Sequence, residues 1–386
     1  MSERHQVGKA LWQEKIIPIL AHDAEHGLNQ VLDWLEAVPD TDVGWQTFLH
    51  LFGEGEHADD PVRIGNDENA LIVRNRVGLA PGFTKDGRGL LALDATGFGL
   101  IGIGTNPPLP QPGNDKPRFF VDMRAEDLLV VNNYFGFNSE EGVAGPVRRV
   151  QKIWTERGRH AIRANLVWSV GPNKHQLAHY EEHKDLRIIS RDIVRAIVPL
   201  MPVLRPKDAI AFNVTSPNTE GLRKLLDRFE ELLFLIFEDL DVIARVYAMP
   251  TPLCFIKLSP DMPEDQMRQV ARGSAQHKKV IALEGFNTTL DEHIRTEFGI
   301  TRMGGTSGDP LRKLAQQKLL MLNGILKLNG FDLDLSAIGG IILPNHATAR
   351  LAIGEQVKTV QFLSGIFKES LTLADEVLDA IAAEAA

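Results

Sequence analysis

Hydrogen-bonding side chains crowd into one segment of the sequence, Asn213-Val-Thr-Ser-Pro-Asn-Thr-Glu-Gly-Leu-Arg223. It directly follows an apolar run typical of a buried strand. Amides both donate and accept hydrogen bonds, so the segment has the chemistry of a site that holds a polar group. Serine, asparagine, proline and glycine also favour ordinary turns. That alternative explains the composition but not the crowding, to which Asn213, Ser216, Asn218 and Thr219 contribute.

Three glycine-bearing loops have the composition of a phosphate site. They are Gly304-Gly-Thr-Ser-Gly308, Gly339-Gly340 and Ser364-Gly365. Backbone N–H groups in such loops, together with a helix N-terminus, bind phosphate in many α/β folds. Lys85 and Lys257 lie at or just after the ends of predicted strands and add positive charge on the same side. The pattern predicts a phosphorylated cofactor without identifying it.

Another glycine pattern does not predict a nucleotide site. Gly97, Gly99 and Gly102 have the spacing G-x-G-x-x-G. A dinucleotide fingerprint follows a strand and opens a helix, whereas these glycines run into and through a predicted strand. We therefore reject the dinucleotide interpretation.

The sequence offers no convincing metal site. His175, His179 and His183 are spaced to share one face of a helix, which could bind a transition metal. A solvated polar face is the favoured alternative, since nothing implies a cavity or supporting ligands. The segment His22-Asp-Ala-Glu-His26 lacks the glutamate that follows the first histidine of a zinc helix. The single cysteine, Cys254, excludes a cysteine-based zinc site and an internal disulfide, and we predict no metal.

Strand-like runs alternate with helical patterns from about residue 70 onward. Eight strand-plus-helix units over this length predict a (β/α)₈ TIM barrel, an α/β fold whose chemistry lies in the loops after the strands. The predicted strands are Arg76–Ala80, Gly99–Gly104, Ala164–Val170, Ala209–Val214, Leu253–Leu258, Val280–Leu283, Leu335–Gly339 and Thr359–Phe362.

The first 52 residues form a separate, helical unit. Apolar residues recur at helical spacing, as in Leu28, Val31, Leu32 and Leu35. The helices either pack on the main domain or form a platform on a membrane surface, and the shortage of basic residues makes attraction to anionic lipid weak. We predict three parts: an N-terminal helical segment (1–52), an acidic linker (53–69) and a cofactor-binding barrel (70–386).

Composition limits the classes of function. The chain has 386 residues, 44% of them hydrophobic, and a formal net charge of −9. An acidic chain lacks the electrostatic footprint of a nucleic-acid binder, so we predict no nucleic-acid partner. No apolar run reaches the roughly 18 residues of a spanning helix, and the polar N-terminus does not resemble a signal peptide. We expect a protein of the cytoplasmic side.

From about residue 70 to the C-terminus, the chain resembles the class 2 (membrane-associated, quinone-dependent) dihydroorotate dehydrogenase family. The 213–223 segment and the 304–308 loop match in order and spacing, together with five further stretches. Those five are Gly78-Leu-Ala-Pro-Gly-Phe-Thr-Lys-Asp-Gly87, Gln111-Pro-Gly-Asn-Asp-Lys-Pro-Arg118, Gly136-Phe-Asn138, Ile256-Lys-Leu-Ser-Pro-Asp261 and Asn287-Thr-Thr289. The N-terminal helices resemble the family's membrane platform more faintly, mainly in Lys9-Ala-Leu-Trp12 and Ala24-Glu-His26.

The resemblance implies FMN as the cofactor and dihydroorotate as the substrate, oxidised to orotate in pyrimidine biosynthesis. Ser216 would remove the C5 proton, and the C6 hydride would pass to flavin N5. Serine at this position indicates class 2, because class 1 relatives use cysteine. The implied catalytic residues are Ser216, Lys85, Thr219 and Phe137. The implied substrate-binding residues are Lys85, Asn133, Asn213, Asn218, Asn287 and Thr288. The implied flavin-binding residues are Pro81, Gly82, Lys85, Thr105, Ser169, Asn213, Lys257, Ser307, Gly308, Gly340, Leu363 and Ser364.

The sequence also departs from the family pattern. Thr84 replaces an aspartate before Lys85, Ser169 replaces an asparagine near the flavin, and Phe286 replaces a threonine just before Asn287. Val121 and Leu363 replace an arginine and a tyrosine that line the family's quinone tunnel. We expect a quinone acceptor and a peripheral position at the cytoplasmic side of the membrane, with a soluble cytoplasmic protein as the alternative. Two rivals are a divergent paralogue, which acts on another cyclic amide or uses a non-quinone acceptor, and an inactive homologue that serves as a binding protein.

Overall fold

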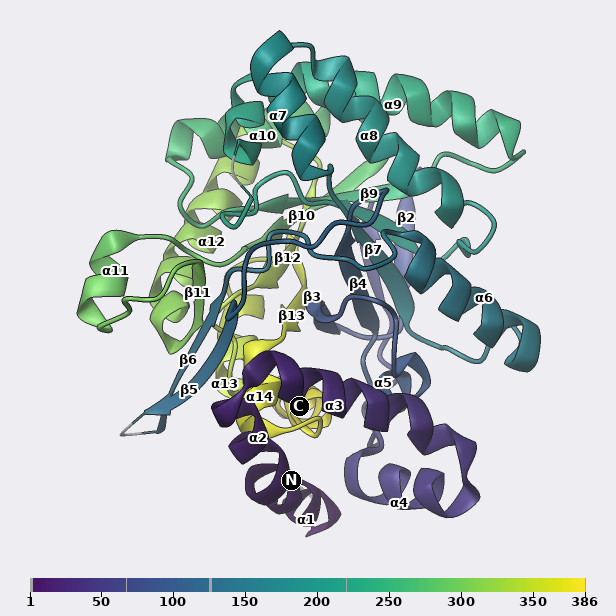
Figure 1. The fold of residues 1–386 in the computed structure, drawn as a ribbon, viewed down its shortest axis with the longest axis vertical. Helices are drawn as coiled ribbons and strands as arrows, with labels where there is room; N and C mark the ends of the chain where they lie inside the picture. The colour runs from purple at the N-terminus through teal and green to yellow at the C-terminus, as the bar shows by residue number, and fades with distance from the viewer. Residues whose placement is uncertain (1–2, 67, 125–126, 220, 386) are drawn as a thin grey trace.

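The computed structural model describes residues 3–66, 68–124, 127–219 and 221–385. Its centre is a closed barrel of eight parallel strands in the order β10-β12-β13-β3-β4-β7-β8-β9 (Figure 1). Every predicted strand corresponds to one of the eight, which confirms the predicted (β/α)₈ barrel. The strands are β3 (Val77–Thr84), β4 (Leu100–Asn106), β7 (Asn165–Val170), β8 (Ala209–Phe212), β9 (Leu253–Leu258), β10 (Val280–Gly285), β12 (Asp334–Ile338) and β13 (Val357–Phe362).

Almost every residue of the barrel strands is buried, because side chains on one face fill the barrel and those on the other meet the helices. Leu100, Val167, Ala211, Phe255 and Ala282 form one apolar cluster inside the barrel. The alternate residues of the same strands belong to a second, larger cluster shared with the surrounding helices. The two-residue period of the strands therefore separates an inner core from an outer one.

A short hairpin contributes to the inner core. Strands β1 (Val62–Gly65) and β2 (Ala70–Val73) pair antiparallel, and their buried side chains join the cluster inside the barrel. The backbone N–H of Gly65 donates to Asp334 Oδ2 of β12 at 2.7 Å. The region predicted as a linker, 53–69, therefore includes a strand that packs on the barrel. Asp67 of this region lies outside the described residues.

A second sheet brings two further segments to the barrel. Strands β5 (Phe119–Arg124), β6 (Leu128–Asn133) and β11 (Gly305–Gly308) form an antiparallel sheet in the order β11-β6-β5. Asn133 of β6 pairs with both Phe119 and Gly305. The sheet joins the region after β4 to the glycine-rich loop after β10, two regions that are far apart in the sequence.

Helices surround the barrel, as Figure 1 shows. A 3₁₀ segment, Leu222–Arg228, leads directly into α9. Cys254 is buried in β9, whereas His175, His179 and His183 are exposed on α7. The helices of the barrel are α5 (Leu90–Ala95), α6 (Ala144–Arg157), α7 (Lys174–His183), α8 (Leu186–Ile197), α9 (Phe229–Val246), α10 (Glu264–Ala275), α11 (Glu292–Glu297), α12 (Asp309–Asn329), α13 (Pro344–Leu351), α14 (Ser364–Glu369) and α15 (Leu373–Ala385).

The N-terminal segment is helical and packs on the barrel. It contains α1 (Glu3–Leu11), a π-helical turn (Trp12–Ile16), α2 (Ile17–His22), α3 (Ala24–Ala37) and α4 (Asp42–Phe52). Its buried apolar residues belong to the same cluster as those between the barrel and its helices. In Figure 1 these helices, in purple, lie beside the yellow C-terminal segment.

Polar contacts also fix the N-terminal segment to the C-terminal one. Lys9 donates to a carboxylate oxygen of Glu369. The buried ring of His5 lies 3.1 Å from the carbonyl oxygen of Gly53 and 3.4 Å from Asp375 Oδ2. Within the described residues, no helix is long and apolar enough to cross a membrane.

Candidate active site

A cavity of about 150 Å³ lies at the carboxyl ends of the barrel strands. The loops after the strands build its walls, as expected for this fold. Most of the predicted site residues line it. They are Pro81, Gly82, Lys85, Thr105, Asn133, Phe137, Asn213, Ser216, Asn218, Lys257, Asn287, Thr288, Ser307, Gly340, Leu363 and Ser364.

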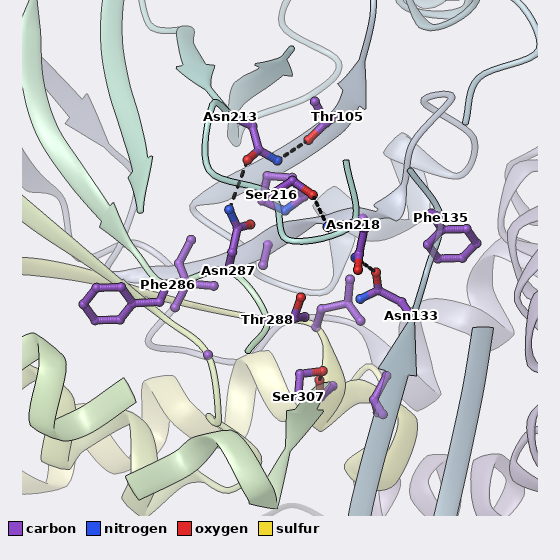
Figure 2. Close-up of a pocket in the computed structure, with 18 of the residues that line it drawn as sticks. Thr105, Asn133, Phe135, Asn213, Ser216, Asn218, Phe286, Asn287, Thr288 and Ser307 are labelled. Carbon is purple, nitrogen blue, oxygen red and sulfur yellow. Dashed lines mark hydrogen bonds between the residues drawn. The ribbon is translucent and has the colours of Figure 1, made fainter. Parts of the chain in front are cut away.

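One side of the cavity carries a chain of amide and hydroxyl groups (Figure 2). Asn213 Nδ2 donates to Thr105 Oγ1 at 2.7 Å, and Thr105 Oγ1 lies 2.8 Å from Ser169 Oγ. Asn287 Nδ2 donates to Asn213 Oδ1 at 3.0 Å and to Thr215 Oγ1 at 2.9 Å. The hydroxyl of Thr215 donates to the backbone oxygen of Lys257 at 2.8 Å, so it accepts from Asn287 Nδ2. That bond sets the orientation of Asn287 and, through it, of Asn213.

A second pair of amides stands near Ser216. Asn218 Nδ2 donates to Asn133 Oδ1 at 2.6 Å, and Asn218 Oδ1 accepts from the backbone N–H of Gly305 at 2.8 Å. The backbone N–H of Asn218 lies 3.4 Å from Ser216 Oγ, a long hydrogen bond. Figure 2 shows Ser216 between these two amide groups, with its hydroxyl directed toward Asn218. The antiparallel sheet thus supplies two groups, from β6 and β11, that the barrel loops alone do not.

Lys85 is the cation on the side of the first strand. Its Nζ donates to the backbone oxygen of Asn138 at 2.8 Å and also to the side-chain oxygen of that residue. It stands 4.9 Å from the centre of the Phe135 ring. Burial, together with the positive charge of Arg118, lowers the pKa of Lys85 to about 7. The ammonium group is therefore poised to lose its proton near neutral pH.

Lys257 is the second cation, and it is 4% exposed. Burial lowers its pKa, which the carboxylate of Glu284 opposes. Among the described residues that line the cavity, these two lysines are the only ionisable side chains, and no carboxylate is present. The cavity therefore favours an anionic ligand.

The far end of the cavity is built from tight turns and small side chains. Gly339, Gly340 and Ser364 line it after β12 and β13, and Ser307 Oγ lies 3.0 Å from Ser364 Oγ. Gly340 has φ +67°, and a Cβ there would lie 2.4 Å from Arg312 Cα, so only glycine fits. Such a turn leaves its backbone N–H groups accessible to a phosphate.

Three predicted residues do not line the cavity. Ser169 is buried behind Thr105, to which it is hydrogen-bonded. Thr219 is buried, and its Oγ1 has no hydrogen-bond partner among the described atoms. Gly308 has φ +84°, and a Cβ added to it would lie 2.3 Å from the backbone oxygen of Leu129. Glu220, inside the segment 213–223, lies outside the described residues.

The residues that depart from the family pattern are all apolar or buried here. Phe286 and Leu363 line the cavity, and Val121 is buried on β5. Thr84 is buried, and its hydroxyl donates to the backbone oxygen of Arg88 at 2.8 Å. Ser169 retains a polar contact, the one with Thr105. The cavity wall is therefore more apolar than the polar family residues at these positions would make it.

Two apolar residues that line the cavity, Phe119 and Phe135, were not predicted from the sequence. Phe119 and Phe135 pack against each other at 5.1 Å between ring centres, and Phe119 packs against Phe367 at 5.7 Å. Phe83 stacks on Phe367 at 6.2 Å. Phe119 lies on β5 and Phe367 on α14, and both elements contact α2. Apolar residues of a wall have the same sequence signal as core residues, so no pattern distinguishes them.

A model of the family described as dihydroorotate dehydrogenase matches residues 69–384. The chain belongs to the dihydroorotate dehydrogenase family. The predicted family and enzyme class, an oxidoreductase, are thereby confirmed. The chain is 33% identical over 311 residues to the dihydroorotate dehydrogenase (quinone) of Shigella flexneri serotype 5b and to that of Escherichia coli K12. Each match covers 80% of this chain and 84% of the relative.

Solved structures of the same family share the fold. The dihydroorotate dehydrogenase of Eimeria tenella in complex with ferulenol matches with a TM-score of 0.73 and 25% identity, over 94% of this chain and 92% of that chain. The ligand-free enzyme from the same organism matches with a TM-score of 0.72 and 25% identity, over 93% and 94%. The likeness spans nearly the whole chain, well beyond the barrel alone.

The donor set fits a flavin phosphate such as FMN. Gly82 lines the cavity and has φ +122°. A Cβ added to it would lie 3.1 Å from the side chain of Leu363, which also lines the cavity, so a side chain at this position would occupy cavity space. The turn at Gly339 and Gly340 suits a phosphate, and Lys257 offers a buried cation to a carbonyl or ring nitrogen. The residues present are thus compatible with the cofactor that the family implies.

Proposed function

We propose that this chain binds FMN and oxidises (S)-dihydroorotate to orotate, a step of pyrimidine biosynthesis. The observation that carries the proposal is the combination of Ser216 with oriented amides and two lysines in one carboxylate-free cavity. A pyrimidine ring presents alternating N–H and C=O edges, which asparagine satisfies in both directions. The substrate's carboxylate suits the positive charge of Lys85. FMN, when bound, supplies the acceptor for the hydride from C6.

In this proposal, Ser216 removes the C5 proton. A serine hydroxyl is a weak base, so it needs a relay for its own proton and a site closed to water. Thr219, whose buried hydroxyl lacks a partner among the described atoms, and Phe137 would complete that relay and close it. Asn133, Asn213, Asn218, Asn287 and Thr288 would hold the ring. Pro81, Gly82, Thr105, Ser169, Lys257, Ser307, Gly308, Gly340, Leu363 and Ser364 would hold the flavin.

The electron acceptor is proposed to be a quinone. Phe119 and Phe135 line the cavity, and β5, which carries Phe119, contacts α2. The apolar character of this side suits an apolar acceptor. With Val121 and Leu363 in place of polar residues, the acceptor would be held by apolar contact instead of by hydrogen bonds. The N-terminal helices would place the chain at the cytoplasmic side of a membrane surface, as a peripheral protein.

The test is anaerobic mixing of the FMN-loaded protein with L-dihydroorotate while the flavin absorbance is recorded. Rapid bleaching with formation of orotate is the expected result. A screen of quinones, fumarate and NAD as oxidants then identifies the acceptor. A yellow protein that stays oxidised would refute the proposed substrate.

A second candidate rests on Phe286. The family has a threonine at this position, and here a buried aromatic ring lines the cavity (Figure 2). Such a change favours a paralogue that oxidises another cyclic amide or uses a different acceptor. A protein that ignores dihydroorotate but is bleached by a related cyclic amide would establish this candidate instead.

A further inference from the structure

Two buried ionisable side chains, a lysine and a glutamate, lie inside the barrel beneath the cavity. Lys257 on β9 and Glu284 on β10 are direct partners in the register of the two parallel strands. Residues paired in this way point to the same side of the sheet. Glu284 is completely buried, with 0% of its surface exposed, and Lys257 reaches the wall of the cavity.

Glu284 belongs to a small polar group contributed by neighbouring strands. Its Oε1 accepts a hydrogen bond from Gln361 Nε2 at 2.9 Å. The same nitrogen donates to Ser336 Oγ at 2.8 Å, and Ser336 also accepts from Thr359 at 2.7 Å. Glu284 Oε2 has no hydrogen-bond partner among the described atoms. One carboxylate oxygen is thus fixed by neighbours, and the other is left without a hydrogen-bond partner.

Neither charge has another ionic partner nearby. Glu284 is the only ionisable side chain in the described part of the chain that influences Lys257, and Lys257 is the only one that influences Glu284. Burial lowers the pKa of Lys257 and raises the pKa of Glu284, and each group opposes the effect of burial on the other. A carboxylate in the same interior in turn needs a cation, because a single buried charge is costly.

We propose that Glu284 is a positioning residue that keeps Lys257 protonated and directed at the wall of the cavity. The inference rests on the proposed function, in which Lys257 contacts the flavin. A positive charge beside a flavin favours its reduced, more negative form, and charges near the ring are a means by which a protein tunes such a cofactor. Glu284 would therefore set the flavin's reduction potential through Lys257 without touching the flavin.

The test is the midpoint potential of the FMN-loaded protein from pH 6.5 to pH 9, for wild type and Glu284→Gln. Glutamine keeps the shape and the hydrogen bond to Gln361 but not the charge. In the variant, Lys257 loses its proton as the pH rises. With increasing pH, the midpoint potential of the variant should therefore fall below that of wild type. The difference should reach about 30 mV at pH 9, which corresponds to a tenfold change in the equilibrium constant of a two-electron couple.

Ser336→Ala is the matched control, because it alters the same polar group without changing a charge. Its potential should differ from that of wild type by an amount independent of pH. In a Lys257→Met background, Glu284→Gln should lose its pH-dependent effect. If Glu284→Gln holds FMN too weakly for redox titration, the dissociation constant of FMN is measured instead. Between pH 6.5 and pH 9, this constant should rise about tenfold more in Glu284→Gln than in wild type.

A pH-independent difference between Glu284→Gln and wild type would overturn the role of Glu284 while leaving the proposed function intact. Persistence of the pH-dependent difference without Lys257 would also overturn it, because the effect would not pass through that lysine. Wild-type protein that binds no FMN would instead overturn the proposed function itself.

Discussion

At the scale of single residues, the site depends on groups whose chemistry is set by their surroundings. Ser216 is 6% exposed and lies between two hydrogen-bonded amide pairs. Lys85 is held by both oxygens of Asn138, and burial brings its pKa to about 7. Two predictions follow from these surroundings, one on a proton transfer and one on a charge.

Replacement of Ser216 by alanine should leave FMN bound but slow flavin reduction by dihydroorotate by at least about 10²–10⁴-fold, the usual contribution of a positioned base. Rapid-mixing absorbance measures the rate. Ser216→Cys is the matched control and should retain more of the rate, because a thiolate can serve as the base. Unchanged reduction in the alanine variant would remove Ser216 from the mechanism.

Binding of orotate should weaken as the pH rises through about 7, because Lys85 is charged below its pKa and neutral above it. Loss of that attraction for a carboxylate, ~1.4 kcal/mol, raises the dissociation constant about tenfold between pH 6 and pH 9. Flavin difference spectra give the constant. In Lys85→Met the pH dependence should disappear. A pH dependence that persists in that variant would assign it to another group.

At the scale of elements, the close fit of α3 against the start of α5 fixes the N-terminal helices beside the site. Gly89 precedes α5 with φ +71°, and an added Cβ would lie 2.7 Å from Leu35 Cβ of α3. The backbone N–H of Gly89 also donates to Glu36 of α3 at 2.7 Å. The contact leaves no room for a side chain, so glycine is needed there for both space and conformation.

Gly89→Ala should lower the free energy of unfolding more than Gly330→Ala does. Gly330 has a similar conformation, φ +63°, but nothing lies within 4 Å of its added Cβ. The control therefore measures the left-handed strain alone, roughly 1–2 kcal/mol. At Gly89, the clash with Leu35 should add about 1–3 kcal/mol to this loss of free energy of unfolding. Denaturant unfolding compares the two, and equal losses would show that α3 moves away at little cost.

At the scale of the whole molecule, an acidic chain carries exposed apolar residues on its N-terminal helices. The net charge is −9. Val7, Leu11, Ile19, Trp34 and Val43 are exposed there, and Val43 is the most exposed of them at 79%. Attraction to a membrane surface would therefore come from apolar contact and not from charge.

Vesicles of neutral phosphatidylcholine should bind the protein at least as well as vesicles with anionic lipid. Val43→Glu should weaken this binding about tenfold, because it removes roughly 1.5 kcal/mol of apolar burial. Leu328→Glu is the control, since Leu328 is 86% exposed but lies on α12. Cosedimentation measures both, and equal effects of the two substitutions would refute the N-terminal helices as the contact surface.

The sequence predicted the barrel and most of the cavity because both depend on local signals. Each buried strand is a short apolar run, and each loop after a strand carries polar or glycine residues, such as Ser216 and Gly340, whose types are visible without the fold. The strand in the predicted linker, β1, was missed because its four residues, which pair with the four residues of β2, are too few to give a clear periodicity. The apolar wall was missed because its phenylalanines look like core residues.

The amino-acid sequence by itself determined the (β/α)₈ fold, the family and the set of polar residues at the carboxyl ends of the strands. Only the tertiary structure decided which groups meet. Closure of the barrel sets the register that places Glu284 beside Lys257 and brings Gln361, which follows much later in the chain, to the same carboxylate. It also brings the β6–β11 sheet to Asn218 and packs the N-terminal helices against the C-terminal ones. Such contacts join distant segments, and a register that spans several strands leaves no local pattern in the sequence.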